Sequence, residues 1–251
     1  SGRRVMTDVR VVVPYRAVDQ HRADSWAWVC RWWKSHFPEW PITIADSGAE
    51  PFNRGASRNQ AMRLSNESVL IIADADTIPD YAAVARGVHM VDTGQAPWVI
   101  PYDGNGRTRE GRYYNLSETA TKARLRFPPD PLVQIVEPWD TDDYEHKLCS
   151  WAGCLIVRRV DAFAAGGYPE FPEWGYEDDC FRTALDMVAG QHQRVPGFCL
   201  HLWHPSTEAQ RFGNPAIEAN RAIFMEYKRA RTQQQMAAVV AVHGGLAHPG
   251  R

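Results

Sequence analysis

Two carboxylates, Asp74 and Asp76, follow an apolar run in the segment LIIADADTIP at residues 70–79. Alternate residues of a strand share a face, so both carboxylates should point the same way unless the chain turns. Adjacent carboxylates repel each other and raise each other's pKa, and a divalent cation removes that repulsion. Oxygen ligands suit Mg²⁺ or Mn²⁺, especially an ion shared with substrate phosphates. The competing interpretation is that Asp76 only caps a helix that begins near Pro79.

Two histidines in the segment HLWHP, at residues 201–205, could complete such a site. Residues three apart on a strand face opposite sides, so His201 and His204 share one ion only if the strand ends or bends, which Pro205 permits. Imidazole suits Mn²⁺, Fe or Zn better than Mg²⁺. The alternative is one buried, hydrogen-bonded histidine and one surface histidine. Together with the aspartates, the histidines indicate a mixed oxygen and nitrogen site for Mn²⁺.

The segment EWGYEDDC, at residues 173–180, places Trp174 and Gly175 before Glu177, Asp178 and Asp179. Acids that open a helix complement its positive N-terminus, which explains one or two of the three. An aromatic ring beside carboxylates also suits sugar binding, because the ring stacks on a pyranose while the carboxylates accept its hydroxyl hydrogens. One carboxylate could take the proton of an attacking hydroxyl as a general base.

The elements that must position these residues alternate between two patterns. Apolar runs predict strands at 8–16, 41–48, 68–76, 97–103 and 197–205, and a strand followed by a short helix within 150–170. Helical periodicity covers 19–37, 53–65, 79–91, 177–190 and 214–236. Fully apolar strands that alternate with helices indicate an α/β fold with a largely parallel sheet covered on both faces. Ligands bind outside the carboxyl ends of such strands, where the sequence has Tyr15, Arg16, Asp46, Asp74 and Asp76.

Composition limits the classes of partner and location. The 251 residues carry a formal net charge of -2, which provides no strong field for nucleic acid or an anionic membrane. The five cysteines form no CxxC pair or disulfide framework, which favours a reducing environment. No leader pattern is visible, and no apolar run approaches the ~20 residues of a membrane span. We therefore expect a cytoplasmic protein without a membrane span and without a nucleic-acid partner.

Taken together, the motifs resemble those of the GT-A glycosyltransferases over most of residues 8–228. VVVPYR is similar to the family's opening strand, FNRGASRNQA to its Asn- and Arg-containing helix, and ADAD to its DxD motif. The segment AGCLIVRRVDAFAAGGYPEFPEWGYEDDCFRTAL resembles the acceptor segment of β-1,4-galactosyltransferases, chondroitin polymerase and polypeptide N-acetylgalactosaminyltransferases. HLWHP resembles the late metal-ligand segment of these enzymes. The five motifs occur in the family's order.

The resemblance implies a single GT-A (Rossmann-like) domain over residues 1–230, with a nucleotide-sugar half at about 8–103 and an acceptor and metal half at about 150–228. Residues 231–251 would form the end of the last helix and a flexible tail, frayed from about residue 240. The polar, Arg-rich stretch 104–148 has no clear pattern.

The resemblance also implies a role for each motif residue. Asp178 would be the catalytic base, and Trp174, Gly175, Glu177 and Asp179 would bind the acceptor. Asp76, His204 and His201 would hold Mn²⁺ or Mg²⁺. The remaining motif residues would bind the nucleotide sugar: Pro14, Tyr15, Arg16, Asp46, Arg58, Asp74 and Ala75.

The activity that the resemblance implies is metal-dependent transfer of a sugar, from a UDP-sugar, to a hydroxyl of a glycan, protein or small molecule. Asp178 favours inversion, because retaining relatives have a segment closer to WGGEN. Tyr176 stands where the second glycine of WGG usually lies, Glu173 replaces a common glycine, and Cys180 follows the acids where an acidic or apolar residue is frequent. These departures concern the acceptor more than the fold.

Four alternatives remain at this point. The chain could be a retaining N-acetylgalactosaminyltransferase-like enzyme, or a non-catalytic sugar-binding module, which would need Trp174 but neither the aspartates nor the histidines. A nucleotidyltransferase would want a glycine-rich loop after the first strand, and PYRAVDQHR contains no glycine. A modified-DNA acceptor is disfavoured by the net charge, although a local run of basic residues exists, which is more often a solvated face: Arg107, Arg109, Arg112, Lys122, Arg124 and Arg126.

Overall fold

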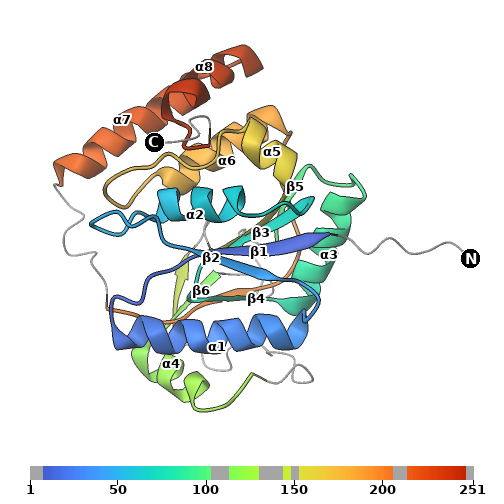
Figure 1. The fold of residues 1–251 in the computed structure, drawn as a ribbon, viewed down its shortest axis with the longest axis vertical. Coiled ribbons are helices and arrows are strands. Elements are labelled where there is room, and N and C mark those ends of the chain that lie inside the picture. Colours follow the sequence, from blue (N-terminus) through green and yellow to red (C-terminus); the bar gives the residue numbers. More distant parts are fainter. Residues whose placement is uncertain (1–7, 103–112, 130–143, 148–152, 206–213, 247–251) are drawn as a thin grey trace, which may run out of the picture.

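The computed structural model describes residues 8–102, 113–129, 144–147, 153–205 and 214–246. Its central strands are β1 (Val9–Pro14), β2 (Ile42–Ala45), β3 (Val69–Ala73), β5 (Trp98–Ile100), β8 (Cys154–Arg158) and β9 (Gln193–Arg194). Among the described residues these form one six-stranded sheet in the order β2-β1-β3-β8-β5-β9 (Figure 1). β8 is antiparallel to both its neighbours, and the other pairs are parallel. The predicted, mostly parallel α/β sheet is confirmed.

Helices cover both faces of this sheet (Figure 1). One face packs against α1 (Gln20–His36) and α3 (Tyr81–Asp92). The other packs against α2 (Arg54–Arg63), α5 (Arg159–Ala164) and α6 (Glu177–Val188). Two further helices, α7 (Pro215–Arg229) and α8 (Gln233–His243), lie outside α6 and contact it.

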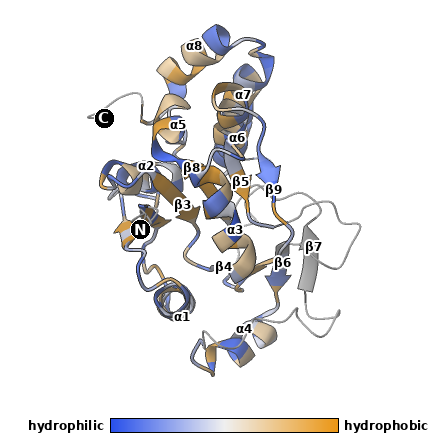
Figure 2. Cartoon of the chain, turned by 90° about the vertical axis from the view of Figure 1, so that its right-hand side faces the viewer, coloured by the Kyte–Doolittle hydropathy of each residue, from blue (hydrophilic) through white to orange (hydrophobic). Residues whose placement is uncertain are grey.

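The alternation of side chains along the strands separates two hydrophobic cores. Val11 and Ile71 belong to the core under α1 and α3, whereas Val12, Leu70 and Ile72 belong to the core under α2 and α6. Val12 pairs with both Thr43 and Ile72, so β1 lies between β2 and β3. Because β3 is covered on both faces, all five of its residues are buried, and Figure 2 shows it as a hydrophobic strand.

A second sheet, which the sequence did not predict, adjoins the carboxyl end of β3. It comprises β4 (Thr77–Pro79), β6 (Tyr113–Leu116), β7 (Tyr144–Lys147) and β10 (Cys199–His201), with α4 (Glu118–Leu125) beside it. The described strands have the order β4-β10-β6-β7, with β10 antiparallel to β4 and parallel to β6. The chain therefore passes from one sheet to the other between Ala73 and Thr77.

Several predicted boundaries are wrong at the ends of elements. The helix expected over 79–91 begins at Tyr81, because Pro79 belongs to β4 and Asp80 is the cap, accepting a hydrogen bond from the Ala83 N–H at 2.9 Å. The helix expected over 214–236 is two helices, because the backbone becomes extended at Ala230 and Thr232 caps α8.

In the described part of the chain, no helix is both long and apolar enough to span a membrane.

The predicted fraying from about residue 240 is wrong up to residue 246. α8 continues to His243, and Leu246 is buried in the core under α6. The Gly245 N–H donates to the Tyr168 carbonyl at 3.1 Å, so this segment is tied to the chain after α5. Of the basic run, Arg107, Arg109 and Arg112 lie outside the described residues, and Lys122 and Arg124 lie in α4.

Candidate functional site

The chain turns directly after β3, so Asp74 and Asp76 meet different partners. The Asp74 N–H donates to the Gly153 carbonyl at 2.9 Å, and the Thr77 hydroxyl donates to the same carbonyl at 2.7 Å. These bonds end β3 and lead the chain into β4. The interpretation of Asp76 as a helix cap is wrong, because Asp80 caps α3.

Asp76 faces the two histidines at the end of β10. His201 Nε2 lies 3.6 Å from one carboxylate oxygen of Asp76, and His204 Nε2 lies 3.5 Å from the other. One potential ligand atom of each residue lies within 4.8 Å of the others. β10 ends at His201, which lets His204 turn to the same side. One carboxylate and two imidazoles form a donor set that fits Mn²⁺ better than Mg²⁺.

Asp74 belongs instead to a buried network of charges that joins α2 to α6. Arg58, 2% exposed, binds Asp74 and donates from Nη1 to an Asp178 oxygen at 2.7 Å. Arg54 donates from Nη2 to the other Asp178 oxygen at 3.0 Å, and from Nε to Glu177 at 3.0 Å. Three carboxylates thus surround two guanidinium groups, and Arg58 links the end of β3 to the first turn of α6.

The environment separates the pKa values of these carboxylates. Burial opposes ionisation of Asp74, but the charges of Arg58 and Arg54 outweigh it and lower the pKa of Asp74 to about 2. Burial raises the pKa of Asp178. The charges of Arg58 and Arg54 lower it, and the charges of Glu177 and Asp74 raise it, so that the net pKa lies above the ordinary value. Asp74 is therefore a fixed anion, whereas Asp178 has a stronger affinity for a proton than an ordinary aspartate. Such divergence is typical of acid–base sites.

The backbone before α6 has an unusual conformation. Tyr176 is in the left-handed region at φ 68, which costs of order 1–3 kcal/mol for a residue with a side chain. Its ring stacks on Phe224 of α7, with centroids 5.4 Å apart. The Gly175 N–H donates to Glu177 at 2.9 Å, so Glu177 holds the neighbouring backbone. Trp174 is 46% exposed, and its ring lies 5.7 Å from the Arg54 guanidinium.

Asn220 of α7 fixes this segment from the other side. Its side-chain amide is buried and donates to the carbonyls of Glu173 at 3.0 Å and Gly175 at 3.2 Å. Asn220→Ala should lower the free energy of unfolding by about 1–3 kcal/mol, because two carbonyls lose their donor. Arg221→Ala, at the exposed neighbouring position, should change it by less than about 0.5 kcal/mol. Chemical denaturation of both variants checks this, and equal stabilities would contradict it.

The predicted nucleotide residues lie at the ends of β1 and β2. Arg16 and Asp46 form two parallel hydrogen bonds, both 2.7 Å, because the parallel pairing of β1 and β2 brings their ends together. Pro14 is the last residue of β1, and the Tyr15 ring lies 5.4 Å from that of Trp26. Ala75 packs, partly buried, against the core under α1. Asp179 lies in the first turn of α6, and burial raises its pKa.

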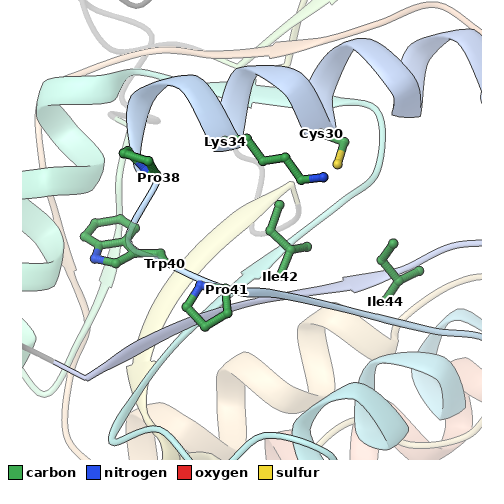
Figure 3. Close-up of a pocket in the computed structure, with 7 residues that line it drawn as sticks. All are labelled: Cys30, Lys34, Pro38, Trp40, Pro41, Ile42 and Ile44. Atoms are coloured by element: carbon green, nitrogen blue, oxygen red, sulfur yellow. The ribbon is translucent and has the colours of Figure 1, made fainter.

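A pocket of about 450 Å³ lies away from these residues, between the end of α1 and the edge strand β2 (Figure 3). Its lining includes Lys34 and Trp40 but none of the predicted site residues. The candidate site is therefore defined by its side chains and not by this cavity.

Two arginines at the site were missed by the sequence analysis. Arg54 is four residues before Arg58 on α2, a spacing that puts both on one helix face and could have indicated a partner for the acids. Arg22 of α1 lies 3.8 Å from Asp76, and no motif indicated it.

No family model and no curated protein matches the sequence. The structure is similar to that of S. aureus TarS 1-349 in complex with UDP-GlcNAc, with a TM-score of 0.57 and 10% sequence identity. That match covers 94% of this chain and 71% of the TarS chain. A second structure of S. aureus TarS 1-349 has a TM-score of 0.52 at 10% identity, covering 93% and 69% of the two chains. The chain therefore shares the α/β fold of these TarS structures, and the likeness does not single out the galactosyltransferase group that its motifs resemble.

Proposed function

We propose that this protein transfers a sugar from a nucleotide diphosphate sugar, preferably a UDP-sugar, to a hydroxyl acceptor with inversion. The observation that carries the proposal is the convergence of Asp76, His201 and His204 two residues from Asp74, which Arg58 links to Asp178. Metal ligands and a buried carboxylate of raised pKa are what such a transfer requires. The likeness to TarS bound to UDP-GlcNAc supports a UDP-sugar as donor.

In this proposal Asp76, His201 and His204 would hold the divalent cation, which would supply positive charge for the leaving diphosphate. Asp178 accepts the proton of the acceptor hydroxyl while that oxygen forms a bond to the anomeric carbon. The bond between the anomeric carbon and the diphosphate oxygen breaks, and its electron pair leaves with the diphosphate. Arg54 and Arg58 keep Asp178 in place and keep Asp74 ionised.

The other predicted residues have binding roles. Pro14, Tyr15, Arg16 and Asp46 would surround the nucleoside, and Trp174 would stack on a sugar. Glu177 and Asp179 would accept hydrogen bonds from acceptor hydroxyls. Glu177 also organises the site, since its carboxylate binds Gly175 and Arg54. The acceptor is a glycan, a protein or a small molecule, and a cytoplasmic location stays a prediction from the cysteine pattern.

A sugar-binding module without catalysis is the second candidate function, and exposed Trp174 favours it. Such a module needs no metal ligands and no carboxylate of raised pKa. The two functions therefore differ in their dependence on a divalent ion.

UDP should raise the melting temperature clearly in Mn²⁺ and only weakly in EDTA, because the ion would join the diphosphate to the protein. Binding to the native state alone stabilises by about 2.7 kcal/mol at 100-fold over Kd. His204→Ala should remove most of the Mn²⁺-dependent increment, whereas His89→Ala, at an exposed position of α3, should keep it. Thermal unfolding with and without UDP measures this, and equal stabilisation in EDTA and Mn²⁺ would sink the proposal.

A further inference from the structure

Arg22 connects the N-terminus of α1 to the predicted metal ligands. Its Nη2 lies 3.2 Å from His204 Nδ1, and its Nη1 lies 3.8 Å from an oxygen of Asp76. Its Nε lies 3.6 Å from Asp19, the residue that caps α1. The side chain is 33% exposed, so it has room to move without disturbing the core.

The contact with Arg22 is a hydrogen bond in only one tautomer of His204. A guanidinium has only donors, so Nδ1 accepts a hydrogen bond from Arg22 only when a neutral ring carries its proton on Nε2. A metal ion on Nε2, the nitrogen that faces Asp76, needs the lone pair there and a proton on Nδ1. A metal ion on Nδ1 would displace the guanidinium directly. In either geometry, the Arg22 contact and a metal–His204 bond exclude each other.

His204 also has the partner that a metal-bound ring requires. The Pro205 carbonyl lies 3.0 Å from the same Nδ1 and can accept a hydrogen bond from it when Nδ1 carries the proton. Metal-binding histidines commonly donate their second N–H to a carbonyl in this way. A shift of the ring proton from Nε2 to Nδ1 would exchange Arg22 for Pro205 as the partner of Nδ1.

We propose that Arg22 and the divalent cation exchange at His204, and that the released guanidinium then binds the anionic phosphates that accompany the cation. This inference rests on the proposed function, its first half on the metal site and its second half on the diphosphate donor. Two neighbouring cations repel each other, so the guanidinium would leave Asp76 and His204 when an ion binds. It remains next to the site because Asp19 anchors Nε. A nucleoside diphosphate offers it oxygen acceptors in bidentate geometry. Arg22 is thus a positioning residue that couples the metal to the donor.

Arg22→Gln tests the exchange with two readouts of opposite sign. Without nucleotide, the affinity for Mn²⁺ should rise several-fold, because the competing cation is gone. In saturating Mn²⁺, the affinity for UDP should fall by roughly 10–100-fold, the worth of one hydrogen bond to a charged group. The affinity for uridine, which has no phosphate, should stay unchanged. Arg31→Gln, at an exposed position of the same helix, should alter none of the three.

Titration calorimetry of each variant with Mn²⁺, then with UDP and uridine, measures these three affinities. Unchanged or weaker Mn²⁺ binding by Arg22→Gln would overturn the exchange, and unchanged UDP binding would overturn the phosphate contact. A wild-type protein that binds Mn²⁺ but not UDP would defeat the proposed function, while the Mn²⁺ affinities of the two variants still judge the exchange. A purely structural role predicts weaker binding of every ligand, together with a lower melting temperature.

Discussion

Asp178→Asn should lower kcat by roughly 10²–10⁴, the usual worth of a general base, with the affinities for Mn²⁺ and UDP nearly unchanged. Asparagine keeps the size of the side chain and an oxygen for Arg58, but its NH2 group cannot accept the hydrogen bond from Arg54, and it cannot take a proton. The substitution leaves Arg54 and Arg58 facing two carboxylates, Asp74 and Glu177, so the network becomes balanced in charge. This balance offsets the lost Arg54 hydrogen bond, so the melting temperature should change little. Initial rates and thermal unfolding of the purified variant measure both effects.

Asp179→Asn is the matched control for this prediction. It alters the neighbouring acid, which contacts neither Arg54 nor Arg58 in the described structure, and should raise the acceptor KM more than it lowers kcat.

The wild-type rate should increase with pH as Asp178 ionises. Because burial raises the pKa of Asp178, this increase in rate should occur above the ordinary pKa of an aspartate. A near-normal kcat in Asp178→Asn would end the assignment of the base.

Arg58→Met should cost about 3–5 kcal/mol of stability, because it leaves Asp74 and Asp178 buried without a main partner. Methionine has similar length and fills the space beside Tyr168, whose ring lies 4.6 Å from the guanidinium. Arg63→Met, on the same helix but 32% exposed at its side chain, should cost about 1 kcal/mol or less. Chemical denaturation at neutral pH compares the two variants. Equal losses in the free energy of unfolding would show that the buried network contributes no more than an exposed ion pair.

The stability that Arg58→Met loses should become smaller as the pH falls. In the wild type the pKa of Asp74 is lowered to about 2, so its ionised form stabilises the fold above the ordinary aspartate pKa of about 3.9. That contribution disappears as the pH falls toward 2. Without Arg58 the pKa of Asp74 should rise, and protonation relieves the unpaired charge. The difference between wild type and variant should therefore shrink in acid.

The sequence predicted the central sheet because β3 is apolar along its whole length, β1 is apolar except for Arg10, and both alternate with helices that have clear caps. It also predicted that Asp76 and the two histidines gather, since Asp76 lies in the turn after β3 and His201 ends β10. It could not separate Asp74 from Asp76. Their divergence depends on the turn through Gly153 and Thr77, which joins two sheets through a contact distant in sequence.

Other features were not predictable for the same reason. The second sheet joins β10, which lies within the strand predicted at 197–205, to β4, whose three residues carry little periodicity. Arg22 reaches His204 across 182 positions of the chain, and only the packing of α1 brings them together. The break between α7 and α8 occurs at Ala230, which has high helix propensity, so tertiary packing overrides the local preference.

The most direct test of the account is to incubate the wild-type protein with Mn²⁺ and a panel of nucleotide sugars, and to identify the nucleotide released. We expect UDP as product from one UDP-sugar, by slow transfer to water or faster transfer to an added acceptor. The release should be lost in Asp178→Asn and His204→Ala. Uridine monophosphate with sugar 1-phosphate, or no nucleoside diphosphate from any donor, would contradict a sugar transfer from a nucleotide diphosphate.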